Sequence, residues 1–327
     1  MTSALLLLGY VLVASTAGAR ALQAADWPSR APRLASLAWQ SLSASVVMAV
    51  TLGGLFLILA HPHFSGGITS FAHLRAQTLA GIQGPPARAV ASLVGVILLA
   101  GAVGRLAMCA LSVARNQRRE RHRLASLVDI LAVDGDTTSM TKVIDHVLPY
   151  AFCVPGARPR VVITSALVSG FTARHLSALL EHERAHLRQR HHLTIQLSQT
   201  FASAFGRVAP FLRTAHAQTR RLVELRADDS ARRHVGEISL AHALTALAEI
   251  PIENCALAAS ASGVEERVHR LVRSQSPLRP VVTFGWSLAV FSLAVAPLAL
   301  AVLPALAMGG WQDLFLVEME LEHPTRR

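Results

Sequence analysis

The chain has 327 residues and a formal net charge of +11, and 52% of its residues are hydrophobic while 16% are charged. This composition is too apolar for an ordinary soluble domain and favours a membrane protein. The three cysteines, Cys109, Cys153 and Cys255, show no CxxC spacing, so they indicate neither a disulfide framework nor a cysteine metal site.

Four apolar segments are long enough to cross a bilayer, which takes about 20 helical residues. In chain order we predict spans at about 2–19, 37–60, 89–113 and 281–308. A cleavable signal peptide would begin with basic residues and the first segment does not, so we interpret it as a span. The small residues at its end would also suit a signal peptidase, which leaves its cleavage open.

The arginines predict how the spans are oriented. They are dense between the first two spans and directly after the third, and Arg273 and Arg279 precede the fourth, whereas the loop 61–88 has only two. Because cytoplasmic loops are enriched in basic residues, we predict an N-terminus outside the cell membrane, a cytoplasmic domain at 114–280 and a short extracytoplasmic tail at 309–327. Arginines beside spans also explain the net charge, so we expect contact with the lipid bilayer and no direct binding of nucleic acid.

The cytoplasmic region begins with two expected helices, Leu124–Val133 and Met140–Leu148, separated by the turn-rich segment Asp134–Asp136. Val161–Thr164 is the strongest strand pattern in the chain. A further helix is expected at Leu240–Ile250.

The segment His182-Glu183-Arg184-Ala185-His186 has the form HExxH. Leucines at helical spacing and the absence of Gly and Pro predict a helix from Thr172, as its N-cap, to about His192. A helix places the two histidines one turn apart on one face, where their imidazoles can bind one zinc ion. Glu183 would then act as the catalytic base on a zinc-bound water.

A catalytic zinc ion usually has three protein ligands, so one more is needed. A second helix is predicted at about His216–His234, and it carries Glu224 and Asp228 on one face. We assign Glu224 to the metal and Asp228 to a hydrogen bond that orients a ligand histidine. The alternative is that both are solvated charges paired with neighbouring arginines.

His192 is a competing third ligand, because some HExxH sites take a histidine six residues after the second one. That pattern needs a glycine where this chain has Gln189, so we reject His192 and expect His191 and His192 to be basic residues at the surface or at a helix end. His234 and His242 are candidates to stabilise an oxyanion, a role that stays open.

The motif and its surroundings resemble a known family. Val154-Pro155-Gly156, Arg158–Thr164 and Leu179–Arg188 look like the corresponding segments of the BlaR/MecR-type integral-membrane zinc peptidases. The segment Glu224–Asp228 resembles the third-ligand helix of that family and of the related HtpX and CAAX-prenyl endopeptidases. Family members often carry Asp a few residues after HExxH, where this chain has His191-His192.

This resemblance implies zinc as cofactor, His182, His186 and Glu224 as its ligands, and Glu183 as the base. It also implies that an edge strand near the active-site helix binds the substrate in extended form, for which Val161–Thr164 is the candidate. The alternative is that Val161–Thr164 is a plain core strand.

The resembling sensors detect penicillins through a separate domain whose nucleophile lies in an SxxK motif. Ser139–Lys142 fits that pattern, but it lies in the expected cytoplasmic region, and a chain with one lysine has no KTG element. We therefore read it as a chance match. The residues after the fourth span are too few for a sensor domain, so we do not expect antibiotic sensing.

We predict a mostly α fold with multi-pass membrane helices and a cytoplasmic HExxH zinc-peptidase domain of gluzincin type that contains a small β element. The expected function is that of a zinc endopeptidase acting on a protein substrate, for which the resemblance suggests a transcriptional repressor or the chain itself. The alternatives are an HtpX-like quality-control peptidase and a non-catalytic membrane receptor or scaffold.

Overall fold

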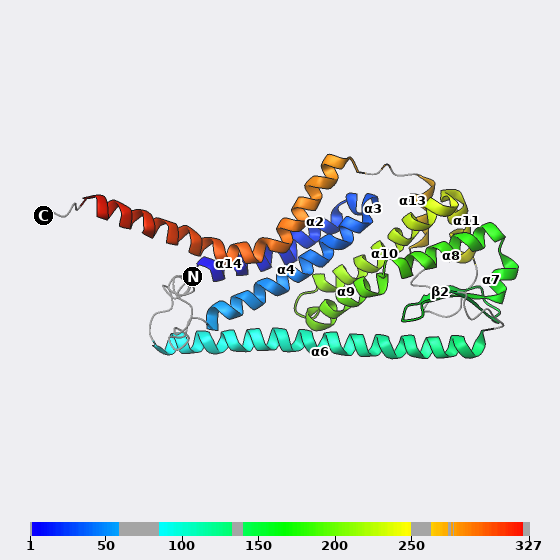
Figure 1. Cartoon of the computed structure of the whole chain (residues 1–327), viewed down its shortest axis with the longest axis horizontal. Coiled ribbons are helices and arrows are strands. Elements are labelled where there is room, and N and C mark those ends of the chain that lie inside the picture. Colours follow the sequence, from blue (N-terminus) through cyan, green and yellow to red (C-terminus); the bar gives the residue numbers. More distant parts are fainter. Residues whose placement is uncertain are drawn as a thin grey trace. The chain divides into compact units, whose positions relative to one another are not determined.

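The computed structural model describes residues 2–58, 85–132, 140–249, 263–273, 276 and 278–322 (Figure 1). The expected turn Asp134–Asp136, Ser139, Cys255 and most of the loop 61–88 lie outside these residues, and so do the last residues of the tail. The fold is mostly α-helical with a small β-sheet, which confirms the predicted fold class. The chain divides into two compact units.

The first unit comprises residues 1–24, 40–108 and 285–327. Helical segments long and apolar enough to cross a membrane are Leu5–Ala24, Pro32–Ile58, Ala89–Leu131 and Pro280–Val302. They belong to α1 (Thr2–Val13), the π-helical turn η1 (Ala14–Gly18), α2 (Ala19–Ala24), α4 (Pro32–Ile58), α6 (Pro85–Leu131) and α14 (Pro280–Glu322). The first apolar segment thus extends past the predicted end at residue 19.

Polar and close contacts join the helices of this unit. The Tyr10 hydroxyl donates to the Ser45 hydroxyl at 2.7 Å and lies 3.1 Å from the Leu293 carbonyl oxygen, so one side chain links α1, α4 and α14. α4 and α6 meet at Gly54 and Gly95, where a Cβ on Gly95 would lie only 2.6 Å from the Gly54 carbonyl oxygen. Small residues of this kind allow membrane helices to approach closely.

The second unit comprises residues 25–39 and 109–284 and contains HExxH. Its β-sheet has the order β1-β3-β2, formed by β1 (Thr141–Ile144), β2 (Ala151–Val154) and β3 (Arg160–Thr164). β3 pairs in parallel with β1 and antiparallel with β2. The strand predicted at Val161–Thr164 is therefore confirmed. It is the central strand of the sheet, so of its two interpretations the core strand is correct and the substrate-binding edge strand is wrong.

Two other predictions for this region were also wrong. The segment Met140–Leu148 was expected to be a helix and instead contains the strand β1, because the main chain of Thr141–Ile144 pairs with β3. Leu124–Leu131 does not form a separate helix but is the end of α6, a helix of 47 residues. The expected boundary at 113/114 accordingly falls inside one continuous helix.

Helices of the second unit pack on the sheet and on one another. They are the short α3 (Trp27–Arg30), α7 (Ser165–Gly170), α8 (Ala173–Arg188), α9 (His191–Phe205), α10 (Phe211–Val235), α11 (Glu237–Ala248) and α13 (Val264–Val272). Leu167, Leu179, Leu240 and Leu271 form a buried core between α7, α8, α11 and α13. Val128 at the end of α6 packs on the other side with Val154 and Val162, which holds the sheet against α6.

Candidate metal centre

α8 carries HExxH and has a defined start and end. The Thr172 side chain accepts a hydrogen bond from the His175 amide, which is the expected N-cap. The helix ends at Arg188, four residues earlier than expected, because Arg190 adopts a left-handed conformation with φ of 50°. α9 then begins at His191, so His191 and His192 do not continue the face of His182 and His186.

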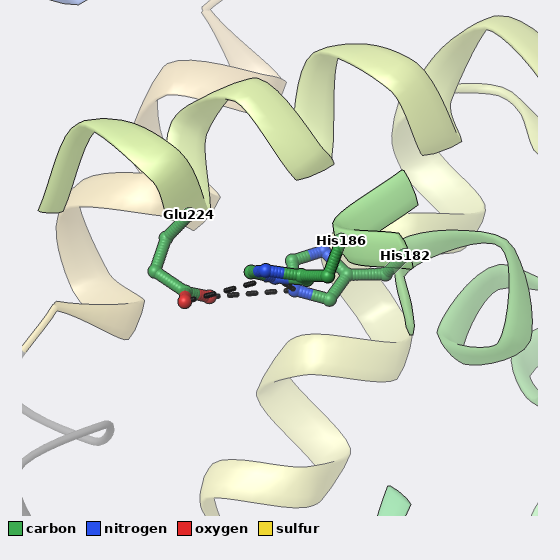
Figure 2. A group of neighbouring side chains, drawn as sticks. All are labelled: His182, His186 and Glu224. Carbon is green, nitrogen blue, oxygen red and sulfur yellow. Dashed lines mark hydrogen bonds and ion pairs between the residues drawn. The ribbon is translucent and has the colours of Figure 1, made fainter. Parts of the chain in front are cut away.

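α10 packs against α8 and brings Glu224 to the two histidines (Figure 2). The two Nε2 atoms lie 3.1 Å apart. Glu224 Oε2 lies 3.3 Å from His182 Nε2, and Oε1 lies 3.7 Å from His186 Nε2. Four-coordinate zinc with bonds of about 2.0–2.2 Å needs ligand atoms about 3.3 Å apart, so these three residues fit one zinc ion.

The second ring nitrogen of His182 is held by a buried ion pair. His182 Nδ1 lies 3.0 Å from Asp228 Oδ1, and Asp228 is 1% exposed. Arg267 of α13 donates to both oxygens of Asp228 at 2.7 and 2.8 Å. Asp228 thus lies within hydrogen-bond distance of a candidate ligand histidine. Its charge is balanced by Arg267, which the sequence did not indicate.

These contacts shift the pKa values of the group. Burial alone would raise the pKa of Asp228, but the Arg267 guanidinium outweighs it and lowers this pKa to about 2. Burial opposes a charge on His182, yet its hydrogen bonds to Asp228 and Glu224 raise the pKa to about 9. Burial would likewise raise the pKa of Glu224, but the two histidines hold it well below its ordinary value. Glu224 and Asp228 are therefore carboxylates at neutral pH.

Glu183 lies beside the ligand positions on α8. Burial raises the pKa of its carboxyl group, and the Cys153 thiol of β2 is a hydrogen-bond partner of that group. Burial also raises the pKa of Cys153, and the nearby charge of Glu183 raises it further. The thiol is therefore neutral and can donate a hydrogen bond. A carboxylate with a raised pKa is a better proton acceptor near neutral pH.

The second ring nitrogen of His186 contacts His191. The two Nδ1 atoms lie 3.1 Å apart, and His191 is 1% exposed. Burial lowers the pKa of His191 to about 3, so the ring is neutral. The expectation of a basic surface or helix-end residue was therefore wrong for His191, because the turn at Arg190 directs it into the core.

The remaining candidates lie elsewhere. His234 contacts the Ser230 carbonyl oxygen, and His242 packs edge-on against His175. Neither belongs to the group of side chains that could share a metal ion, as far as the described residues show. The sequence analysis assigned no role at the site to Cys153, His191 or Arg267. Each of these residues reaches the site through tertiary contacts and belongs to no short motif.

The site combines two imidazoles and a carboxylate that can share one ion, and a buried glutamate lies beside them. This is the arrangement of a metal-dependent hydrolase. Residues 114–273, just under half of the chain, match the family model described as Peptidase family M48. This match supports a membrane-type zinc metallopeptidase, and it does not confirm the BlaR/MecR type specifically. No curated protein and no solved structure matched the chain.

Proposed function

We propose that the chain is a membrane zinc endopeptidase that hydrolyses peptide bonds of protein substrates on the cytoplasmic side. The observation that carries this proposal is the convergence of His182, His186 and Glu224 within reach of one ion. When bound there, zinc would act as a Lewis acid toward the scissile carbonyl and a water molecule. Asp228 would keep the His182 proton on Nδ1, which leaves Nε2 free to bind the metal.

Glu183 is the proposed base. Its carboxylate would take a proton from the attacking water and deliver it to the leaving amide nitrogen, so that the C–N bond breaks and a carboxylic acid and an amine are formed. The Cys153 thiol donates to the same carboxyl group and would hold it in place.

β2 is the proposed substrate-binding strand, in place of β3. It is at the edge of the sheet and contacts α8. The Thr164 amide donates to the Tyr150 carbonyl, and main-chain bonds in an antiparallel pair alternate. The main-chain groups of Ala151 and Cys153 therefore point away from β3, and an extended peptide could pair with them beside Glu183.

The substrate is proposed on the resemblance alone, as a transcriptional repressor or the chain itself. An HtpX-like peptidase would instead cut many misfolded membrane proteins, and a non-catalytic receptor or scaffold would cut none. The test compares the peptides of cells that make the parent protein with those of cells that make Glu183→Gln. Peptides that depend on Glu183 would come from one protein for a signalling peptidase and from many proteins for an HtpX-like peptidase. A receptor or scaffold would give no such peptides.

The test of the reaction uses the full-length protein in detergent with labelled casein as a probe substrate. We expect Glu183→Gln to keep stoichiometric zinc and to slow cleavage by roughly 10²–10⁴-fold, whereas Glu224→Ala should lose zinc. Glu181→Gln is the matched control, because Glu181 lies on the same helix and pairs with Arg184 and Arg188. Equal cleavage by Glu183→Gln and the parent would refute the proposal.

A further inference from the structure

A chain of hydrogen bonds runs from α10 to the Nδ1 atom of His186. The Gln189 Nε2 group donates to the main-chain oxygen of Arg226 at 3.4 Å, and Gln189 Oε1 lies 3.3 Å from His191 Nε2. His191 Nδ1 lies 3.1 Å from His186 Nδ1. Arg226 lies between Glu224 and Asp228 in the sequence of α10, so this chain joins the two helices that carry the metal ligands.

The direction of every bond follows from its starting point. A main-chain oxygen can only accept, so the Gln189 amide must turn its NH2 group toward Arg226 and its oxygen toward His191. His191 must then carry its proton on Nε2, and its bare Nδ1 can only accept. His186 consequently carries its proton on Nδ1, and its Nε2 has a free lone pair toward His182 and Glu224.

We infer that Gln189 and His191 are positioning residues that fix the tautomer and ring orientation of His186 for metal binding. His191 does for His186 what Asp228 does for His182, but as a neutral acceptor. This inference rests on the proposed zinc site and adds two residues to it.

Arg190 explains how His191 reaches this position. A non-glycine residue with positive φ is uncommon, and here it ends α8 and starts α9 within two residues. The chain thereby turns sharply enough for His191 to lie against His186, with the ring centroids 4.8 Å apart. If α8 continued, a residue five positions after His186 would point to another face of the helix.

The test measures zinc affinity of the full-length protein by competition with a chromophoric chelator. We expect His191→Phe, which keeps a ring but removes the acceptor, to weaken zinc binding by roughly 10- to 100-fold. His191→Asn should restore most of the affinity, because its Oδ1, like Nδ1 of histidine, is bonded to Cγ and can accept from His186. His192→Phe is the matched control in the neighbouring residue and should bind zinc like the parent.

The melting temperature of each zinc-free variant reports whether it folds. If His191→Phe does not fold, Gln189→Leu decides, since it removes the group that sets the direction of the bonds and should also weaken zinc binding. Parent-like affinity in the folded variant would overturn the inference while leaving the proposed function intact. A parent protein without stoichiometric zinc would instead refute the proposed function, and the inference with it.

Discussion

Arg267 is a buried cation among polar side chains of the candidate site. It contacts Asp228 through two hydrogen bonds, and its Nη1 atom lies 3.6 Å from Glu224 Oε2. Burial alone would disfavour its charge, but Asp228 and Glu224 raise the pKa of the guanidinium. Arg267 therefore stays charged and holds the carboxylate that orients His182.

We expect Arg267→Met to lower the free energy of unfolding by about 3–5 kcal/mol, because it removes the arginine that balances the buried charge of Asp228 and leaves that charge with the His182 contact alone. Chemical denaturation of the full-length protein in detergent measures this loss. Arg221→Met is the matched control: its ion pair with Glu266 is more than a third exposed, so the same substitution should cost at most about 1 kcal/mol. Similar losses in both variants would contradict the argument.

The spacing of residues in the sequence was sufficient to propose that His182, His186 and Glu224 lie close together, and their ligand atoms do so in the structure. HExxH sets the distance between two imidazoles within one helix, and two predicted amphipathic helices were enough to propose that Glu224 lies near them. His191 could not be predicted in the same way, because its position depends on the backbone conformation of Arg190. Arg267 lies 39 residues after Asp228, and no sequence period connects them.

At the scale of elements, the edge strand β2 has two different faces. The Ala151 side chain packs against the core formed with α8, whereas Phe152 packs toward Val128 of α6. Cys153 contributes its thiol to Glu183 and turns its main-chain groups away from β3. The strand thus links the candidate substrate edge to the proposed base.

We expect Cys153→Pro to lower kcat/KM for casein and leave zinc content and melting temperature nearly unchanged. The N–H group of residue 153 faces away from β3, so a proline at this position of an edge strand is tolerated. Proline lacks this N–H group, which a bound peptide would need as a hydrogen-bond donor. Cys153→Ala is the control, because it also loses the thiol and keeps the N–H group. If both variants lose activity equally, the main chain of β2 does not bind substrate.

The strands β1 and β2 were harder to predict than the helices, since each has only four residues. A short apolar run cannot be assigned to helix or strand by its period alone. β1 is a strand because it pairs in parallel with β3, about twenty residues later in the chain, and that contact is not visible in its own sequence.

On the scale of the whole molecule, the second unit includes residues that precede the second apolar helix. Arg270 of α13 donates to the Ser29 main-chain oxygen at 2.7 Å and to both oxygens of Asp229. Arg226 donates to the Ser36 hydroxyl. Segments that pack together are expected on the same side of a bilayer, so we predict one side for the first loop and the candidate metal centre.

We predict that this shared side is the cytoplasm. In a protein whose native cysteines are replaced by serine, Ala173→Cys at the exposed start of α8 should react with a membrane-impermeant maleimide only after cells are permeabilised. Gln312→Cys, in the predicted extracytoplasmic tail, should react in intact cells. The opposite labelling pattern would show that the orientation inferred from the arginines is wrong.

The bond between Arg270 and Ser29 joins residues 241 positions apart, which affects how the protein is made. At a translation rate of about 5–20 residues per second, the first loop leaves the ribosome roughly 10–50 s before its partner. The HExxH helix and Glu224 are synthesised within that interval. A nascent chain that ends before Arg267 would carry all three candidate ligands and still lack the arginines that hold Asp228 and Ser29.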